Sequence, residues 1–347
     1  MTKNSVKNNL LILFVLLLVI GSINFFMDPF WCFEHSHRYN SVQKATNERQ
    51  QKANYIYFTS NQYDTLLLGS SRTTYMNRHA FKRMNVYNFS APAMRPQEYI
   101  TYIDFTINDA KQPIQRIIIG TDFFGYLDYG SFMFKNAPNI VKTTQSPYYR
   151  WKVLFSFDAL ENSFKNVRDY LNPTKHTDRY DRDNVKSRIK IIQYGSKKEQ
   201  LFALQQDALA YARGEYSSQP NKNYYNIMKT IKNNYKNKEF IIYTTPVTEV
   251  LLQLLIEKGH YNNYENWLRT LVNIYGTVYH FMYINPMSKD YINNFADCNH
   301  AYPELNAIVA QKITTKCQSE PKDFGVILTS SNIEYELKKL RIINGIK

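Results

Sequence analysis

The stretch 64-DTLLLGSSRTTYMNRHAF-81 decides the fold, because an apolar run ends in a glycine and two serines directly before a segment with the pattern of a helix. Such a run is typical of a short buried strand, and the glycine permits a sharp turn after it. A serine on a strand-to-helix turn exposes its hydroxyl near the positive end of the helix dipole. Two alternatives follow: Ser70 or Ser71 is a nucleophile, or a turn of small residues only reverses the chain.

Further apolar runs of strand length alternate with helical patterns along the chain. The expected strands are 65–69, 84–90, 115–120, 239–245 and 277–283. Between them, residues such as Tyr99, Ile103 and Ile107 recur near helical spacing. Short buried strands that alternate with helices predict βαβ units and a doubly wound parallel sheet covered on both faces.

The predicted organisation places one membrane helix before one α/β domain. Its parts are a cytoplasmic N-terminus at 1–9, a transmembrane anchor at 10–27, a juxtamembrane connector at 28–62 with a helix near 47–58, an α/β domain at 63–317, and a C-terminal tail at 318–347. Tyr, Asn and Lys dominate residues 125–237, which we predict to be a helical insertion or lid. Helices are expected there near 150–171, 197–213 and 223–235.

The anchor is the uncharged run 10-LLILFVLLLVIGSINFFM-27, which follows Lys3 and Lys7. Its length as a helix is roughly 27 Å, close to the hydrocarbon thickness of a bilayer. A cleaved signal peptide is the alternative, but it would have a shorter apolar region and a small-residue cleavage site, whereas 25-FFMDPFW-31 is bulky. The positive-inside tendency predicts a single-pass protein with a cytoplasmic N-terminus and an extracytoplasmic (periplasmic or cell-surface) main domain.

The net charge of +14 favours contact with anionic surfaces, but the basic residues are scattered and form no run of five, so nucleic acid is not an expected partner.

The cysteines are Cys32, Cys298 and Cys317. An oxidising compartment would permit one pair to bridge and leave an odd thiol. We expect Cys298 and Cys317 not to pair with each other, because most of a helix separates them. No spacing of His, Cys, Asp or Glu indicates a metal site, and no cofactor is implied.

A second motif, 297-DCNHAYPEL-305, lies in a polar loop before the last helix of the α/β pattern. A serine nucleophile needs a base within hydrogen-bond reach, and that base needs an acceptor that fixes its tautomer. His300 and Asp297 are the residue types that supply these groups. A lone histidine is more often a surface or helix-capping residue, so the inference depends on the joint occurrence of both motifs.

These motifs resemble the SGNH (GDSL-like) hydrolase superfamily. The resemblance covers about 64–124 and 239–316. The matching positions, in chain order, are Gly69-Ser70-Ser71 at the Gly-Asp-Ser block, the Asn88–Ala91 turn at the oxyanion glycine, Gly120-Thr121-Asp122 at Gly-x-Asn, and Asp297-x-x-His300 at Asp-x-x-His. The membrane anchor and the Gly-Ser-Ser block are similar to the branch that includes the teichoic acid D-alanyl transfer protein and the alginate acetyltransferases.

The resemblance implies a three-layer α/β/α, flavodoxin-like fold and acyl transfer or ester hydrolysis on a cell-envelope polysaccharide. It implies that Ser71 is the nucleophile, with His300 as the base and Asp297 orienting it. Its implied oxyanion hole consists of Ser71, Ser90, Ala91 and Asp122. A membrane protein that delivers acyl groups is a further partner that the resemblance allows.

Two departures from the family pattern leave alternatives open. Asp122 stands where the family has an asparagine, so either it pairs with Arg72 or the oxyanion hole is impaired. Arg72 itself has two interpretations, a salt bridge at the helix start or a contact with an anionic substrate. The long Tyr- and Lys-rich middle matches nothing in the family. A catalytically inactive scaffold for glycan binding or envelope assembly is the alternative function, and a lipase or thioesterase held at the bilayer is a third.

Overall fold

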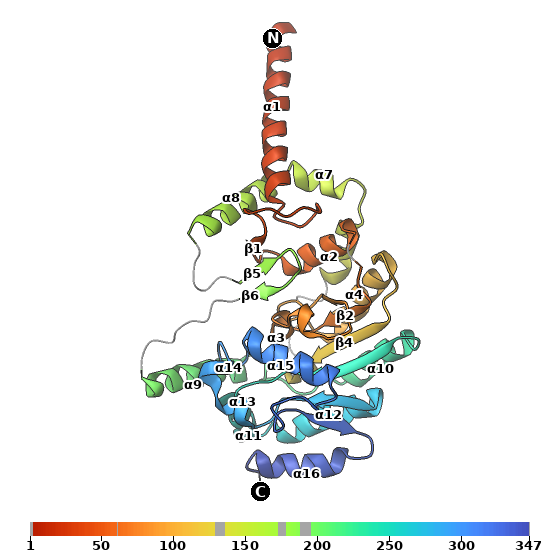
Figure 1. The fold of residues 1–347 in the computed structure, drawn as a ribbon, viewed down its shortest axis with the longest axis vertical. Helices are drawn as coiled ribbons and strands as arrows, with labels where there is room; N and C mark the ends of the chain where they lie inside the picture. The colour runs from red at the N-terminus through yellow and green to blue at the C-terminus, as the bar shows by residue number, and fades with distance from the viewer. Residues whose placement is uncertain (1–2, 61, 129–135, 173–177, 188–195, 347) are drawn as a thin grey trace. The chain divides into compact units, whose positions relative to one another are not determined.

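The computed structural model contains a six-stranded, mostly parallel sheet (Figure 1). The structure describes residues 3–60, 62–128, 136–172, 178–187 and 196–346. The strands, in sheet order, are β3 (Val86–Asn88), β2 (Thr65–Leu68), β4 (Arg116–Thr121), β7 (Glu239–Thr244), β8 (Thr277–His280) and β9 (Val326–Thr329). β9 runs antiparallel to β8, and the other neighbours are parallel. The predicted α/β class and the five predicted strands are confirmed.

The central strands are buried on both faces, as their uninterrupted apolar sequence predicts. Leu66–Leu68 of β2 and Ile117–Ile119 of β4 have no exposed surface and pair in register. Leu67 and Ile118 pack on one face against Leu305 and Val309 of α15 (Pro303–Thr314). Their neighbours alternate to the other face. The helix α4 (Pro96–Asp109) contacts β2, and α12 (Tyr261–Tyr275) contacts β7 and β8.

The chain divides into two compact units. Unit 1 consists of Met1–Asn61 and Pro138–Ile189, and unit 2 consists of Gln62–Ala137 and Lys190–Lys347. The helices of unit 2 are α3 (Ser71–Thr74), the 3₁₀ helix η1 (Arg78–Ala80), α4 (Pro96–Asp109), α5 (Phe123–Tyr126), α9 (Lys197–Arg213), α10 (Tyr224–Asn234), α11 (Glu249–Glu257), α12 (Tyr261–Tyr275), α13 (Pro286–Lys289), α14 (Tyr291–Asn294), α15 (Pro303–Thr314) and α16 (Ile333–Ile343).

Unit 1 combines the N-terminal helix with part of the predicted insertion. Its helices are α1 (Lys3–Met27), α2 (Glu48–Phe58), α6 (Ala137–Thr144, whose first residue belongs to unit 2), α7 (Tyr149–Leu154) and α8 (Phe157–Leu171). Its antiparallel sheet has the order β1 (Val42–Lys44), β5 (Arg179–Asp181), β6 (Lys186–Ser187). Of the predicted insertion, residues 129–135, 173–177 and 188–195 lie outside the described residues.

The predicted connector at 28–62 is a folded part of unit 1. Lys186 Nζ lies 3.0 Å from Glu48 Oε1, and Arg182 Nη1 lies 3.0 Å from Asp28 Oδ2. These pairs join the connector to residues 138–189, so the predicted single insertion is divided between the two units. The partners in each pair are more than 130 residues apart in the chain, so no local sequence pattern predicts these contacts.

The segment after residue 317, which the prediction left as a tail, completes the sheet of unit 2. β9 pairs with β8, and Arg341 of α16 forms an ion pair with Glu265 of α12, with 2.6 Å between Nε and Oε1. The predicted boundary at residue 317 is therefore too early.

The predicted membrane run lies within one long helix. Ser5–Met27 of α1 is long and apolar enough to cross a membrane, and only 17% of the tested window is buried inside the protein. At a rise of about 1.5 Å per residue it spans roughly 35 Å. A spanning helix is thus available at the N-terminus.

Candidate active site

The β2–α3 turn gives its two serines different environments. Ser70 is fully buried and caps α3, and its Oγ accepts a hydrogen bond from the Arg72 N–H at 3.3 Å. Ser71 is the first residue of α3 and half-buried. Gly69 is required by close packing, because a Cβ there would lie 2.7 Å from Thr73 Cβ. The turn therefore uses Ser70 to begin the helix and leaves the Ser71 hydroxyl available.

His300 lies between Ser71 and Asp297. Its Nε2 is 2.8 Å from Ser71 Oγ, and its Nδ1 is 2.8 Å from Asp297 Oδ2 and 3.0 Å from Oδ1. A carboxylate only accepts, so this network assigns the proton to Nδ1 and leaves Nε2 to accept from the serine hydroxyl. The structure thus brings together the three predicted catalytic residues in the order that activation of a serine needs.

The loop that carries this pair is closed by its own hydrogen bonds. Asp297 Oδ1 accepts from the Asn299 N–H at 2.9 Å and from the His300 N–H at 2.7 Å. The Ala296 N–H donates to the His300 carbonyl at 2.8 Å. Burial alone raises the pKa of Asp297, but the hydrogen bonds and charge of His300 and the two N–H groups outweigh it and hold this pKa below its usual value. Asp297 is therefore kept as the anion that orients the imidazole.

Two helices hold the same loop from outside. Thr248, which caps α11, donates its hydroxyl at 2.9 Å and its N–H at 3.1 Å to the Cys298 carbonyl. Asp207 of α9 accepts from the Cys298 N–H at 3.1 Å. Sequence reasoning missed Thr248 and Asp207, because a single threonine or aspartate in a helical segment forms no motif.

Asp122 pairs with Arg72 below the turn. Arg72 Nη1 lies 3.1 Å from Asp122 Oδ1, both side chains are 2% exposed, and the Thr245 hydroxyl also donates to this carboxylate. Of the two alternatives for Asp122, the structure has the ion pair. An ionised carboxylate that is directed at Arg72 has no proton to donate, so the predicted oxyanion role of Asp122 is not supported.

Arg72 is enclosed by protein groups. Its Nη2 donates to the Tyr216 hydroxyl at 2.8 Å, and its guanidinium carbon lies 4.8 Å from the centre of the Phe124 ring. Burial by itself lowers the pKa of Arg72, but Tyr216, Asp122 and Glu215 raise it above its usual value. These contacts favour the salt-bridge interpretation of Arg72 over a contact with substrate.

The N–H groups of Ser90 and Ala91, two further predicted oxyanion donors, are used elsewhere. The Ser90 N–H donates to Asn88 Oδ1 at 3.1 Å, and the Ala91 N–H donates to the Gly69 carbonyl at 3.1 Å. The turn after β3 is thus bonded to the turn after β2. The Ser90 and Ala91 N–H groups are therefore engaged and are not free to act as the predicted oxyanion donors. The Ser71 N–H has no acceptor among the described residues and, at the first position of a helix, none within α3.

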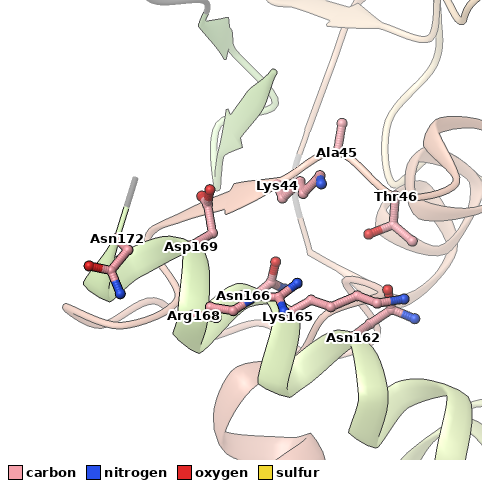
Figure 2. A pocket seen from close by; sticks show the side chains of 9 residues that line it. All are labelled: Lys44, Ala45, Thr46, Asn162, Lys165, Asn166, Arg168, Asp169 and Asn172. Carbon is pink, nitrogen blue, oxygen red and sulfur yellow. The ribbon is translucent and has the colours of Figure 1, made fainter. Parts of the chain in front are cut away.

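Two cavities among the described residues are lined by residues other than Ser71. One of about 330 Å³ lies beside Asp297 and is also lined by residues of α9, among them Leu204 and Asp207. Another, of about 460 Å³, lies in unit 1 and is lined by polar side chains of α8 and of residues 44–46 (Figure 2). The described part of the chain has no group of three or more His, Cys, Asp or Glu side chains arranged for a metal ion. Cys32, Cys298 and Cys317 are free thiols.

Comparisons of the chain with protein-family models, with curated proteins and with solved structures found no match.

Proposed function

We propose that this chain is a membrane-anchored serine acyltransferase or esterase with Ser71, His300 and Asp297 as its catalytic residues. The observation that carries the proposal is the 2.8 Å contact between Ser71 Oγ and His300 Nε2, with Asp297 on the other ring nitrogen. Separated by 229 positions in the chain, the serine and histidine meet only through the fold.

The topology supports the SGNH-like assignment. Counted from β2, the parallel strands have the order 2-1-3-4-5, which is the flavodoxin-like order, and ligands of such sheets bind outside the carboxyl ends of the strands. Ser71 follows the end of β2, and Asp122 follows the end of β4. The proposed site therefore lies at the carboxyl ends of the parallel strands, where sheets of this kind bind their ligands.

In the proposed reaction, Ser71 Oγ attacks the carbonyl carbon of an ester while His300 Nε2 takes its proton. Asp297 stabilises the imidazolium, and the Ser71 N–H donates to the oxyanion, a donor worth about 3 kcal/mol in comparable sites. Collapse of the tetrahedral intermediate expels the alcohol, which receives the proton from His300. Water or a sugar hydroxyl then resolves the acyl-enzyme by the reverse sequence.

The substrate class rests on the resemblance and on the anchor. If α1 crosses the membrane with Lys7 on the cytoplasmic side, the rest of the chain lies outside the cytoplasm, where O-acyl groups of envelope polysaccharides are found. A membrane protein that delivers acyl groups is the partner that a transferase, but not an esterase, would need.

The test is labelling of the full-length protein in detergent or nanodiscs with a fluorophosphonate probe, together with hydrolysis of a chromogenic acetyl ester. Ser71→Ala and His300→Gln should each reduce both signals by at least about 10³-fold. Ser70→Ala is the matched control. It should keep the activity because the Ser70 hydroxyl caps α3 and is not the proposed nucleophile. Equal loss from both serine variants would overturn the assignment of Ser71.

A non-catalytic scaffold is the second candidate, because the Ser90 and Ala91 N–H groups are engaged and Asp122 is paired. It predicts that the folded wild type neither labels nor hydrolyses. Glycan-array binding that survives Ser71→Ala would then support it.

A further inference from the structure

Helices α7 and α8 present a row of large apolar side chains to the outside of unit 1. The exposed fractions are 76% for Phe157, 57% for Phe164 and 65% for Leu171 on α8, and 52% for Trp151 on α7. Burying such side chains is favourable, so a contiguous exposed row marks a surface that contacts something apolar.

The row occupies one face of α8. Phe157, Leu160, Phe164, Val167 and Leu171 follow each other at steps of three and four residues, which places them on one side of a helix. We call this set the apolar face of α8.

A different face of α8 is polar. It supplies Lys165, Arg168 and Asp169 to the pocket in Figure 2, and their side chains point away from the helix into that polar space. The helix is thus amphipathic, with charged residues on the side that lines this cavity.

The junction between α7 and α8 contacts α1 within its membrane-length run. A Cβ at Gly21 would lie 2.7 Å from the Phe155 ring, so that ring packs directly on the glycine. The Asn24 side chain donates to the carbonyls of Leu154 at 2.9 Å and Ser156 at 3.0 Å. In α8, the Ser163 hydroxyl donates to Asn24 Oδ1 at 3.2 Å. Figure 1 shows α7 and α8 beside the C-terminal end of α1.

These contacts fix the depth of the two helices along α1. Gly21 precedes Met27, the last residue of α1, by about 9 Å at a rise of 1.5 Å per residue. In-plane amphipathic helices bury their apolar face about 5 to 10 Å into the boundary between head groups and acyl chains. Tryptophan and tyrosine are enriched at that boundary, and Tyr148 and Trp151 of this chain are exposed.

We propose that α7 and α8 lie in the plane of the membrane that α1 crosses, with the apolar face of α8 and Trp151 inserted among the lipids. The occupant of this surface is the lipid bilayer, because the surface is continuous with a membrane helix and carries the aromatic residues of an interface. In this arrangement one spanning helix, α1, and two in-plane helices, α7 and α8, attach unit 1 to the membrane. The proposal depends on α1 spanning a bilayer and is independent of the catalytic proposal.

The test is quenching of tryptophan fluorescence by brominated phosphatidylcholine in nanodiscs that contain the full chain. Trp31 and Trp267 are 2% and 0% exposed and are shielded by protein, so Trp151→Phe gives a background with little lipid-dependent quenching. In that background, Phe164→Trp reports the apolar face, Lys165→Trp reports the polar side as the matched control, and Leu13→Trp reports the span.

The proposal predicts that bromine near the head-group end of the acyl chain removes most of the emission from Phe164→Trp and leaves that from Lys165→Trp unchanged. Iodide in the buffer should quench Lys165→Trp more strongly. Strong iodide quenching of Phe164→Trp without lipid quenching would overturn the proposal and indicate a surface for a protein partner. Loss of lipid quenching in Leu13→Trp as well would show that α1 does not span the bilayer, and the proposal would then fail because it depends on that span.

Discussion

Arg72 and Asp122 form a buried ion pair that joins the turn after β2 to the end of β4. Solvent does not stabilise either charge, because both side chains are only 2% exposed. A buried pair of this kind contributes little compared with an apolar pair of the same shape, but loss of one partner leaves the other charge uncompensated. The pair therefore makes the chain sensitive to single substitutions below the proposed nucleophile.

We expect Arg72→Leu to lower the free energy of unfolding by about 3 to 5 kcal/mol because it leaves Asp122 buried and unpaired. Arg72→Leu combined with Asp122→Leu should be more stable than Arg72→Leu alone. Denaturant unfolding of the full chain in one detergent measures the wild type, Arg72→Leu, Asp122→Leu and the double variant. Additive losses would show that the two side chains do not depend on each other.

His280 is a second buried titratable group, and both of its ring nitrogens are hydrogen-bonded. The Tyr264 hydroxyl donates to the Met282 carbonyl and therefore accepts from His280 Nε2 at 2.7 Å, while Thr244 Oγ1 lies 2.9 Å from Nδ1. Burial lowers the pKa of His280 from 6.5 to about 3. Between these values the unfolded chain binds the proton and the folded chain does not.

The His280 contribution to stability should therefore be complete above about pH 6.5 and decline by roughly 1.4 kcal/mol for each pH unit down to about pH 3. His280→Asn removes the imidazole, so its stability should depend less steeply on pH in this window. Urea unfolding at several pH values measures both slopes. Equal slopes for the two proteins would mean that His280 is protonated in the folded state.

At the scale of elements, the residue that caps α11 also holds the loop that carries His300. Thr248 Oγ1 accepts from the Leu251 N–H at 3.3 Å and donates to the Cys298 carbonyl at 2.9 Å. We expect Thr248→Ala to cost about 1 kcal/mol of stability as a lost helix cap. It should also reduce ester hydrolysis, because the loop with His300 loses an anchor.

Thr248→Ser, which keeps the hydroxyl, is the control for that prediction and should retain both stability and hydrolysis. Thermal unfolding and initial rates, measured on the same preparations, separate the two effects. Wild-type rates in a destabilised Thr248→Ala protein would show that the anchor does not position His300.

How far the sequence predicted these elements depends on whether the signal was local. Uninterrupted apolar runs predicted the strands of the parallel sheet, because residue type and chain order carry that information. Two short motifs predicted Asp297, His300 and a serine at position 70 or 71, and the family resemblance selected Ser71. β9 was not predicted, since Val326–Thr329 is only partly buried and pairs with β8 across about fifty positions.

The acceptors of the Ser90 and Ala91 N–H groups, which the resemblance implies as oxyanion donors, could not be predicted from the sequence. Which acceptor a backbone N–H finds depends on the approach of two turns, as in the bond between Ala91 and Gly69. For the same reason, residues 138–189 gave no sign that they would fold with the N-terminal segment, because their partners lie in connector sequence far upstream.

For the whole molecule, the C-terminal segment is part of the core of unit 2. Leu340 of α16 is 1% exposed, whereas Tyr335 on the same helix is 65% exposed. Leu340→Ala should lower the free energy of unfolding by about 2 to 5 kcal/mol, and Tyr335→Ala should change it by less than about 0.5 kcal/mol. Calorimetry of the full chain tests this contrast. Two equal, small effects would show that α16 folds independently of the sheet.

The division of unit 1 between two stretches of chain has a consequence for biosynthesis. Asn24, a polar residue near the end of α1, is bonded to Leu154, which is 130 positions later. At a synthesis rate of about 5 to 20 residues per second, roughly 6 to 26 s separate the two residues at the ribosome. If α1 crosses a membrane, the Asn24 amide is inside or beside the bilayer during that interval and lacks its native partners. Synthesis of α1 thus precedes the contacts that complete its packing, and an insertase or chaperone would have a defined period in which to act on this helix.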